Sequence, residues 1–476
     1  MRGRSKSKTE GASMFIRNSF VDGQGKRTFD SGDVYEGRFR NGRPDGRGVL
    51  RKADDSYIYD GDWCDGMMHG DGEIIWEKHK EYIRYLGEFK ENIRQGRGML
   101  ETKDGTIYKG HFINGSMIKG RIILQDESVY EGEVKGGVPH GTGTMHWSNG
   151  TTFHGEWLHG APYGLGEQSD SSQSTLRGCF GEAGVSGPGE RTFMVTLDGQ
   201  DSDDNNASQN KYVYKGDMID NKMHGNGKLL WPDGRIYEGE FRADAIEGQG
   251  TMIWPAGADL RSQARTDQKV KTKLSMKIMN TYQGRFRNGL FSGEGTLKFA
   301  NGVVYQGKFK CGRYHGLGKI DMSAINQGQY SGQWEDGRIF GKGTRIWDNG
   351  DVYIGDFGVN GKLHGQGSFV WKNGSQYVGE FAHGERSGSG KQIWESGKYY
   401  IGEWKDGHPE GKGVLVDPNM DSEGDRKNLT IGIWGKNGLI KELVVGNNSI
   451  DNDACETDDV AVFESLRTSL ETTKIE

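Results

Sequence analysis

The stretch Tyr-Lys-Gly-Asp-Met-Ile-Asp-Asn-Lys-Met-His-Gly-Asn-Gly-Lys-Leu-Leu-Trp-Pro-Asp-Gly-Arg-Ile-Tyr, residues 214 to 237, decides the fold of this chain. It contains Tyr-x-Gly, His-Gly-x-Gly and Asp-Gly in a fixed order, and Tyr237 opens another copy 23 residues after Tyr214. Variations of this unit fill most of the chain. A period of this length indicates an array of structural repeats rather than one globular core.

Fourteen clear copies and one degenerate copy of the unit follow one another. The clear copies open at Tyr35, Tyr59, Tyr85, Tyr108, Tyr130, Phe153, Tyr214, Tyr237, Tyr282, Tyr305, Tyr330, Tyr353, Tyr377 and Tyr400. The array is divided by two segments of different composition and flanked by incomplete units. The sequence therefore predicts a basic disordered N-terminus (1–11), a partial capping repeat (12–34), repeats (35–199, the degenerate copy at 176–199), an acidic disordered loop (200–211), repeats (212–255), a basic insertion (256–280), repeats (281–428), a C-terminal cap (429–445) and an acidic tail (446–476).

Composition narrows the class of protein. The 476 residues include 79 glycines but only 8 prolines, and without a Gly-X-Y period this excludes collagen. An aromatic content of 11% argues against a disordered chain. The net charge is -6, whereas nucleic-acid-binding proteins are typically basic, so this class of protein is not indicated. Four widely separated cysteines, and no apolar run that would form a signal peptide or a membrane span, favour a cytoplasmic location.

The Asp-Gly and Asn-Gly pairs predict β-hairpins, because a type I′ turn needs positive φ at both central residues. With such a turn at Asp233-Gly234, Leu230 is expected opposite Tyr237 and Trp231 opposite Ile236. Both faces of the sheet would then carry an apolar ladder. A glycine inside a strand weakens it, so the glycine of Tyr-x-Gly is expected to lie beneath a neighbouring aromatic ring. No helical segment separates the strands to form a second layer.

The unit Tyr-x-Gly-Glu/Asp-Phe/Trp followed by His-Gly-x-Gly resembles the membrane occupation and recognition nexus (MORN) repeat, over approximately residues 12–438. The resemblance implies an all-β fold, an elongated single-layer twisted antiparallel sheet of consecutive β-hairpins. It also implies non-catalytic work. Proteins with such arrays serve as cytoskeletal, ciliary or junctional scaffolds, and some are phosphoinositide-associated or flank an enzyme domain.

The insertion after Trp254 is rich in basic residues, some of which alternate with apolar ones. The candidate contacts for an anionic lipid or an acidic partner are Arg261, Arg265, Lys269, Lys271, Lys273 and Lys277. A period of two predicts an extended strand with one cationic face. Each basic residue near an anionic membrane contributes about 1 kcal/mol, so this segment could give weak attachment. The same residues also fit a solvated charged loop.

The tail contains a short apolar pattern behind the helix-capping residues Thr457 and Asp458. The i, i+3 and i+4 spacing predicts a short C-terminal amphipathic helix that could dock a partner, formed by Val462, Phe463, Leu466 and Leu470. A solvated tail is the alternative.

The sequence offers no catalytic constellation. The histidines of His-Gly-x-Gly belong to different repeats, whereas metal ligands must converge on one point. The acidic residues after Tyr-x-Gly are expected to form a solvated face that pairs weakly with Lys or Arg across strands. No phosphate-binding loop or dinucleotide fingerprint occurs. We therefore expect no enzymatic activity, no cofactor and no metal.

The functional expectation is a scaffold whose exposed Tyr and Trp rows bind other proteins, cytoskeletal or ciliary, or a second copy of the chain. No nucleic-acid partner is expected. One alternative is a peripheral adaptor at the cytoplasmic membrane surface, associated with phosphoinositides through the basic insertion. Another is a regulatory module of a lipid-kinase or methyltransferase system. Location in the cytoskeleton, in a cilium or at the membrane would separate these hypotheses.

Overall fold

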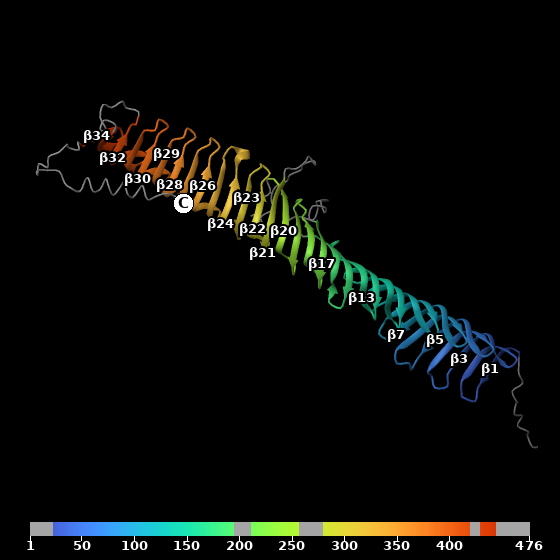
Figure 1. The fold of residues 1–476 in the computed structure, drawn as a ribbon. Coiled ribbons are helices and arrows are strands. Elements are labelled where there is room, and N and C mark those ends of the chain that lie inside the picture. Colours follow the sequence, from blue (N-terminus) through green and yellow to red (C-terminus); the bar gives the residue numbers. More distant parts are fainter. Residues whose placement is uncertain (1–21, 195–210, 257–278, 419–428, 444–476) are drawn as a thin grey trace, which may run out of the picture. The chain divides into compact units, whose positions relative to one another are not determined.

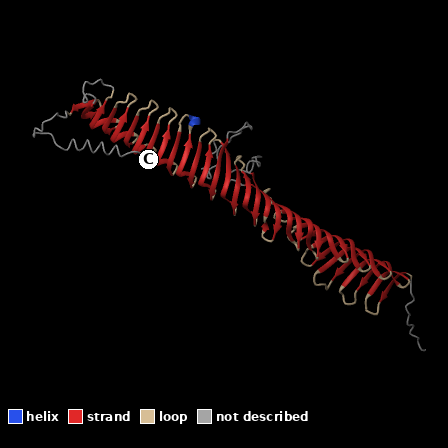
Figure 2. Cartoon of the chain, in the orientation of Figure 1, coloured by secondary structure: helices blue, strands red, loops and turns tan. Residues whose placement is uncertain are grey.

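The computed structural model describes residues 22–194, 211–256, 279–418 and 429–443. The chain divides into two units, Met1–Lys222 and Met223–Glu476, which are described separately. The expected all-β fold is confirmed in both units (Figures 1 and 2). Among the described residues, the only helical segment is a 3-10 turn at Ser323–Ile325. None of the described helices is long and apolar enough to span a membrane.

Unit 1 contains a succession of short strands. They are β1 (Gly23–Thr28), β2 (Val34–Arg40), β3 (Arg43–Arg51), β4 (Tyr57–Cys64), β5 (Met67–Trp76), β6 (Tyr82–Lys90), β7 (Ile93–Thr102), β8 (Ile107–Ile113), β9 (Ser116–Ile123), β10 (Val129–Lys135), β11 (Val138–His146), β12 (Thr152–Leu158), β13 (Ala161–Ser169), β14 (Thr175–Gly181), β15 (Gly184–Val185), β16 (Gly187–Met194) and β17 (Lys211–Ile219).

Unit 2 continues the same pattern from β18, whose first residue closes unit 1. Its strands are β18 (Lys222–Leu230), β19 (Ile236–Arg242), β20 (Ala245–Pro255), β21 (Met279–Arg287), β22 (Leu290–Lys298), β23 (Val304–Lys310), β24 (Arg313–Asp321), β25 (Gln329–Glu335), β26 (Arg338–Ile346), β27 (Val352–Phe357), β28 (Leu363–Val370), β29 (Gln376–Ala382), β30 (Glu385–Ile393), β31 (Tyr399–Lys405), β32 (His408–Val416), β33 (Leu429–Gly435) and β34 (Gly438–Glu442).

Within each unit, every strand pairs antiparallel with the next strand in the chain, and only β15 interrupts this order by pairing with β14 beside β16. Figure 1 shows the strands of each unit side by side in chain order, and none of the described residues forms a second layer over either face. The hydrophobic core is therefore a ladder of side chains on one face of a single sheet. We call this face the aromatic face, because the repeat tyrosines lie on it, and the other the opposite face.

The predicted register at the Asp-Gly loops is wrong by one residue. Leu229, not Leu230, pairs with Tyr237, and Leu230 pairs with Ile236. The loop is wider than a two-residue turn: the Trp231 N–H donates to the Arg235 carbonyl oxygen at 2.9 Å. Within this loop only Gly234 has positive φ, at 86°. A type I turn closed by a left-handed glycine fits this geometry, and it removes Trp231 from the ladder.

The two-residue turns lie at the other end of the strands, where the sequence pattern did not predict them. Asn288 and Gly289, between β21 and β22, both have positive φ, at 49° and 74°. Arg287 pairs with Leu290 directly across them. Positive φ at both central residues is the requirement of a type I′ turn, so this end of the hairpins is the tight one. The two long edges of each sheet therefore differ: one carries tight turns and the other carries wide loops.

Aromatic rings interlock from one repeat to the next. Tyr35 packs edge-to-face on Phe39 of its own strand, with ring centroids 5.0 Å apart, and on Trp63 of the next repeat, at 5.2 Å. The same contacts recur along both units, for example between Tyr377 and Trp404 at 5.2 Å. Such pairs add about 0.5–1.5 kcal/mol beyond the area they bury. The expectation that each repeat buries its aromatics against its neighbours is confirmed, but the buried ladder lies on one face only.

The glycines of the repeat make room for the tyrosine, as expected. A Cβ built on Gly37 would lie 2.5 Å from the Tyr35 hydroxyl oxygen, and one on Gly48 would lie 2.6 Å from Tyr35 Cε2. Gly37 and Gly48 are paired on adjacent strands. One tyrosine ring thus covers two facing glycines, which explains why the spacing of Tyr-x-Gly and Gly-x-Gly is fixed.

Candidate interaction surfaces

The candidate binding residues of the basic insertion and of the tail lie outside the described residues. The six basic candidates fall between residues 257 and 278, and the four apolar tail residues fall between 444 and 476. The points of attachment are nonetheless defined. Pro255 pairs with Met279, so the basic segment leaves the sheet between β20 and β21.

The segments outside the described residues leave the sheets at one kind of edge. In unit 1 the acidic segment joins Met194 to Lys211, which pair with each other. In unit 2 the basic segment joins β20 to β21, and residues 419–428 join β32 to β33. Each of these junctions stands where other repeats have a wide loop. The tight-turn edge is mostly closed by two residues, although β27 and β28 are joined there by the longer segment 358–362.

The repeat tyrosines do not form the exposed docking row that the sequence led us to expect. Twelve of them, from Tyr35 to Tyr400, are at most 1% exposed. Their hydroxyl groups donate to backbone carbonyls three residues onward, as Tyr59 does to Asp62 at 2.8 Å. Burial raises the pKa of Tyr35 and Tyr330 to about 12. The tyrosines are buried because each ring packs over two glycines, and the hydroxyl group of the buried ring then donates to a backbone carbonyl.

Most of the acidic residues after Tyr-x-Gly are exposed, as expected, but several also accept a backbone hydrogen bond that the sequence did not predict. A β-bulge follows each Tyr-x-Gly, as the register shift between Gly239 and Phe241 shows. The Glu240 carboxylate accepts the Gln249 backbone N–H at 3.0 Å. Gln333 does the same for Lys342 at 3.0 Å. A bulge leaves a backbone donor without a strand partner, and this side chain satisfies it.

The opposite face of unit 1 carries cross-strand ion pairs at the variable residue of Tyr-x-Gly. Examples are Lys26–Glu36 at 3.1 Å, Arg47–Asp60 at 3.4 Å and Arg121–Glu131 at 3.4 Å. Most of these side chains are more than half exposed, so each pair contributes at most about 1 kcal/mol. This row of unit 1 is therefore mostly polar, apart from Leu86, which is 43% exposed.

The equivalent positions in the C-terminal part of unit 2 are apolar. Ile354, Val378 and Ile401 occupy the variable position of Tyr-x-Gly on β27, β29 and β31. A second row lies beside them on the same face. We call these residues the apolar strip: Ile346, Val352, Ile354, Val370, Val378, Ile393, Tyr399, Ile401, Val414, Val416 and Ile431.

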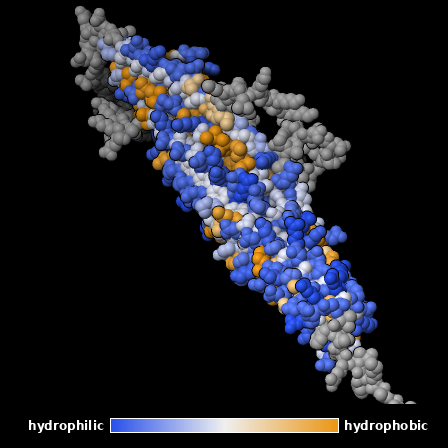
Figure 3. Space-filling view, turned by 90° about the vertical axis from the view of Figure 1, so that its right-hand side faces the viewer, coloured by the Kyte–Doolittle hydropathy of each residue, from blue (hydrophilic) through white to orange (hydrophobic). Residues whose placement is uncertain are grey.

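The apolar strip is accessible to solvent in the described residues. Ile354, Ile346 and Val370 are 48%, 41% and 37% exposed, and the other members of the strip are half-buried. Figure 3 shows hydrophobic residues gathered in clusters toward the C-terminal end of unit 2. An exposed apolar surface of this kind marks a place where another chain segment packs. Reading the variable residue of Tyr-x-Gly in successive repeats could have found it from sequence.

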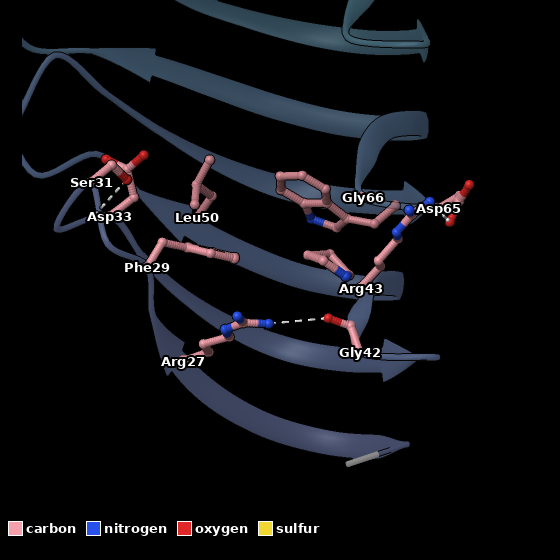
Figure 4. A pocket seen from close by; sticks show the side chains of 11 residues that line it. Arg27, Phe29, Ser31, Asp33, Gly42, Arg43, Leu50, Asp65 and Gly66 are labelled. Carbon is pink, nitrogen blue, oxygen red and sulfur yellow. Dashed lines mark hydrogen bonds and ion pairs between the residues drawn. The ribbon is translucent and has the colours of Figure 1, made fainter. Parts of the chain in front are cut away.

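A hollow of about 510 Å³ opens between the first hairpins of unit 1 (Figure 4). Phe29 and Trp63 line it, and Arg27 crosses its floor to donate to the Gly42 carbonyl oxygen at 3.2 Å. Asp33, also in the lining, is engaged by Lys52 at 2.6 Å, and this hydrogen bond lowers the pKa of its carboxyl group. The charged groups are thus largely paired, and the hollow offers mainly aromatic surface.

No group of three or more His, Cys, Asp and Glu in the described ranges lies close enough to hold a metal ion. His364, one of the histidines of His-Gly-x-Gly, instead lies 6.5 Å from His383 at the neighbouring tight turn, measured between ring centroids.

A family model, described as MORN repeat, matches more than half of the chain. The matched residues are 17–34, 35–57, 59–79, 85–107, 130–152, 214–234, 237–258, 282–304, 305–321, 330–352, 353–376, 377–399 and 400–420. These segments coincide with successive hairpins of both units.

Curated relatives are similar over a small part of their length. Alsin of Rattus norvegicus is 30% identical over 108 residues, which are 21% of this chain and 6% of Alsin. The ALS2 C-terminal-like protein of Homo sapiens is 33% identical over 84 residues, covering 17% of this chain and 9% of that protein. Among solved structures, a streptogramin B lyase covers 65% of this chain and 87% of its own, at 8% identity and a TM-score of 0.10. A TM-score this low carries no structural conclusion.

Proposed function

The chain belongs to the MORN-repeat family, and from this premise we propose that it is a non-catalytic scaffold that binds other proteins through the surfaces its repeats leave free. The main observation behind the proposal is that the fixed residues of each repeat have structural roles and are not available to bind a partner. The tyrosines cover glycines, the acidic residues satisfy bulges, and the tight turns close the ladder. Only the wide-loop edge and the opposite face differ from repeat to repeat.

The wide-loop edge is the proposed partner-binding surface. It carries the acidic segment 195–210 in unit 1 and the basic segment 257–278 in unit 2, so it presents opposite charge in the two units. Charge complementarity of this kind selects partners and raises the rate of association. Assignment of the partners to a cytoskeletal or ciliary assembly is supported by the family resemblance alone.

Proximity labelling from the full chain tests this proposal. Replacing residues 200–210 or 257–278 by Gly-Ser segments of equal length should each remove a distinct set of labelled proteins. A matched control exchanges the tight-turn pair Asn288-Gly289 for Asp-Gly, which keeps the turn and should leave the labelled set unchanged. Identical labelled sets from all four proteins would contradict the proposal. Imaging of the tagged chain would separate cilium, cytoskeleton and membrane.

Membrane attachment through the basic segment is a second candidate function. The supporting observation is that Pro255 and Met279 pair at the edge of the sheet, so the basic segment is attached at that edge. Vesicles containing anionic lipid should bind the chain weakly, and added salt should release it. Changing Lys269, Lys271, Lys273 and Lys277 to Glu should abolish the binding. Vesicle binding that does not depend on lipid charge, on salt or on these substitutions would refute membrane attachment through the basic segment.

A further inference from the structure

We propose that the apolar strip of unit 2 is covered by the chain's own C-terminal tail, through Val462, Phe463, Leu466 and Leu470. This inference concerns contacts within one chain and stands independently of the partners bound at the wide-loop edge. In this arrangement the tail packs on the opposite face of β26–β33, and the aromatic face is not involved.

The contrast between the two units is the first support. At the variable position of Tyr-x-Gly, unit 1 has mostly charged or polar residues, some of them in ion pairs such as those of Glu36 and Glu131, and Leu86 is the apolar exception. Unit 2 has Ile354, Val378 and Ile401 at that position, followed on the next strands by Val414 and Ile431. The repeat fold itself does not require apolar residues there, since most repeats of unit 1 fold the same way with a charged or polar residue at that position. Something other than the fold therefore accounts for the strip.

The location of the tail is the second support. β34 ends at Glu442, so the tail leaves the sheet at the end where the strip lies. About nineteen residues separate residue 443 from Val462, and a flexible linker of that length spans on the order of 24 Å. Neighbouring strands are about 4.8 Å apart, so this reach covers about five strands. The tail's apolar residues can therefore reach β29–β33 without strain.

The tail segment also matches the apolar strip in length and in charge. A helix rises about 1.5 Å per residue, so the stretch from Val462 to Leu470 would span roughly two to three strands with its apolar residues on one side. Residues 446–476 contain eight acidic and two basic residues. Lys391 lies in the row of the strip between Val378 and Ile401, its Nζ 5.0 Å from the centre of the Tyr399 ring. A cation within the strip suits an acidic segment such as that around Glu464.

Hydrogen exchange of the full chain tests the proposal. Amides of residues 460–472 should exchange roughly ten-fold or more slowly than in an unstructured peptide, the factor that about 1.4 kcal/mol of docking supplies. The double substitution Ile354→Lys and Ile401→Lys should remove this protection, and so should Phe463→Asp. The matched control is Leu86→Lys, which changes an exposed apolar residue at the same repeat position of unit 1 and should leave the tail protected.

A photo-cross-linking amino acid at position 463 identifies what the tail touches. Cross-links within one chain to β27–β33 are expected. Cross-links between chains, with protection that rises with protein concentration, would overturn the proposal in favour of a second copy as the occupant. Tail amides that exchange at the unstructured rate, or protection that survives the strip substitutions, would refute the docking outright. Neither result would bear on the partner-binding proposal, because that proposal is tested by replacing segments 200–210 and 257–278.

Discussion

The phenol ring of Tyr59 lies over Gly72 of the adjacent strand so closely that a Cβ on Gly72 would lie 2.5 Å from Tyr59 Cε2. Gly61, which pairs with Gly72, is covered by the same ring. This contact recurs along both units and sets the repeat. It also makes each tyrosine dependent on two glycines that are distant from it in sequence by two and thirteen residues.

Gly72→Ala should lower the free energy of unfolding by about 1–3 kcal/mol, the usual cost of overpacking, because the new methyl group displaces a fully buried ring. Urea denaturation followed by circular dichroism measures the change. The matched control is Gly25→Ala, where the added Cβ would meet Phe39 at an ordinary 3.5 Å and the expected change is below about 0.5 kcal/mol. Equal effects of the two substitutions would disprove the role assigned to the tyrosine.

Glu240→Ala should destabilise the chain by about 0.5–1.5 kcal/mol because it removes the hydrogen bond that the Gln249 N–H of the bulge donates at this exposed site. Glu240→Gln keeps a carbonyl acceptor and should recover most of the loss, as the natural Gln333 indicates. The control is Glu238→Ala, whose side chain is 70% exposed and pairs only with Lys228 at 3.4 Å, so its loss should be close to zero. Thermal unfolding of the three variants is the measurement. A Glu238 effect as large as the Glu240 effect would favour the solvated-face interpretation instead.

Replacing Ala243 by Asn should stabilise the protein by up to about 1 kcal/mol. Ala243 occupies a tight turn with φ of 49°, a left-handed conformation that Asn adopts more readily than Ala. The reciprocal change Asn288→Ala, at the equivalent turn with φ of 49°, should destabilise by a similar amount. Differential scanning calorimetry of the pair provides the comparison. Shifts of the same sign in both variants would contradict the assignment of these turns.

The array should unfold in alkaline solution between about pH 10 and pH 12. Burial raises the pKa of Tyr35, Tyr130 and Tyr330 from 10.0 to about 12, because an ionised phenolate loses its hydration there. The stability that this burial supplies is complete below pH 10, the ordinary pKa, and is lost as the pH rises through about 12. Tyrosinate absorbance and circular dichroism should therefore change together. Ionisation of all the tyrosines near pH 10 with an intact β-sheet signal would count against the burial of the twelve repeat tyrosines.

The position of the tight turn in each hairpin could not be predicted from the Asp-Gly and Asn-Gly dipeptides alone. Asp233-Gly234 and Asn288-Gly289 look alike as dipeptides, yet only the second forms a type I′ turn. The difference lies in the neighbours: the bulge after Tyr-x-Gly adds a residue to one strand and thereby fixes which end of the hairpin closes in two residues. A rule that considers the dipeptide alone places the tight turn at the wrong end and shifts the register by one.

By itself the sequence determined that this protein is an all-β array of hairpins, because the 23-residue spacing of Tyr214 and Tyr237 and the alternation around them are local properties of the chain. The tertiary structure alone decided which face is buried and what the acidic residues of the repeat bind. These depend on which strand lies beside which and in what register. Side-chain burial in a single-layer sheet comes entirely from neighbouring repeats, so it becomes visible only when the repeats are placed together.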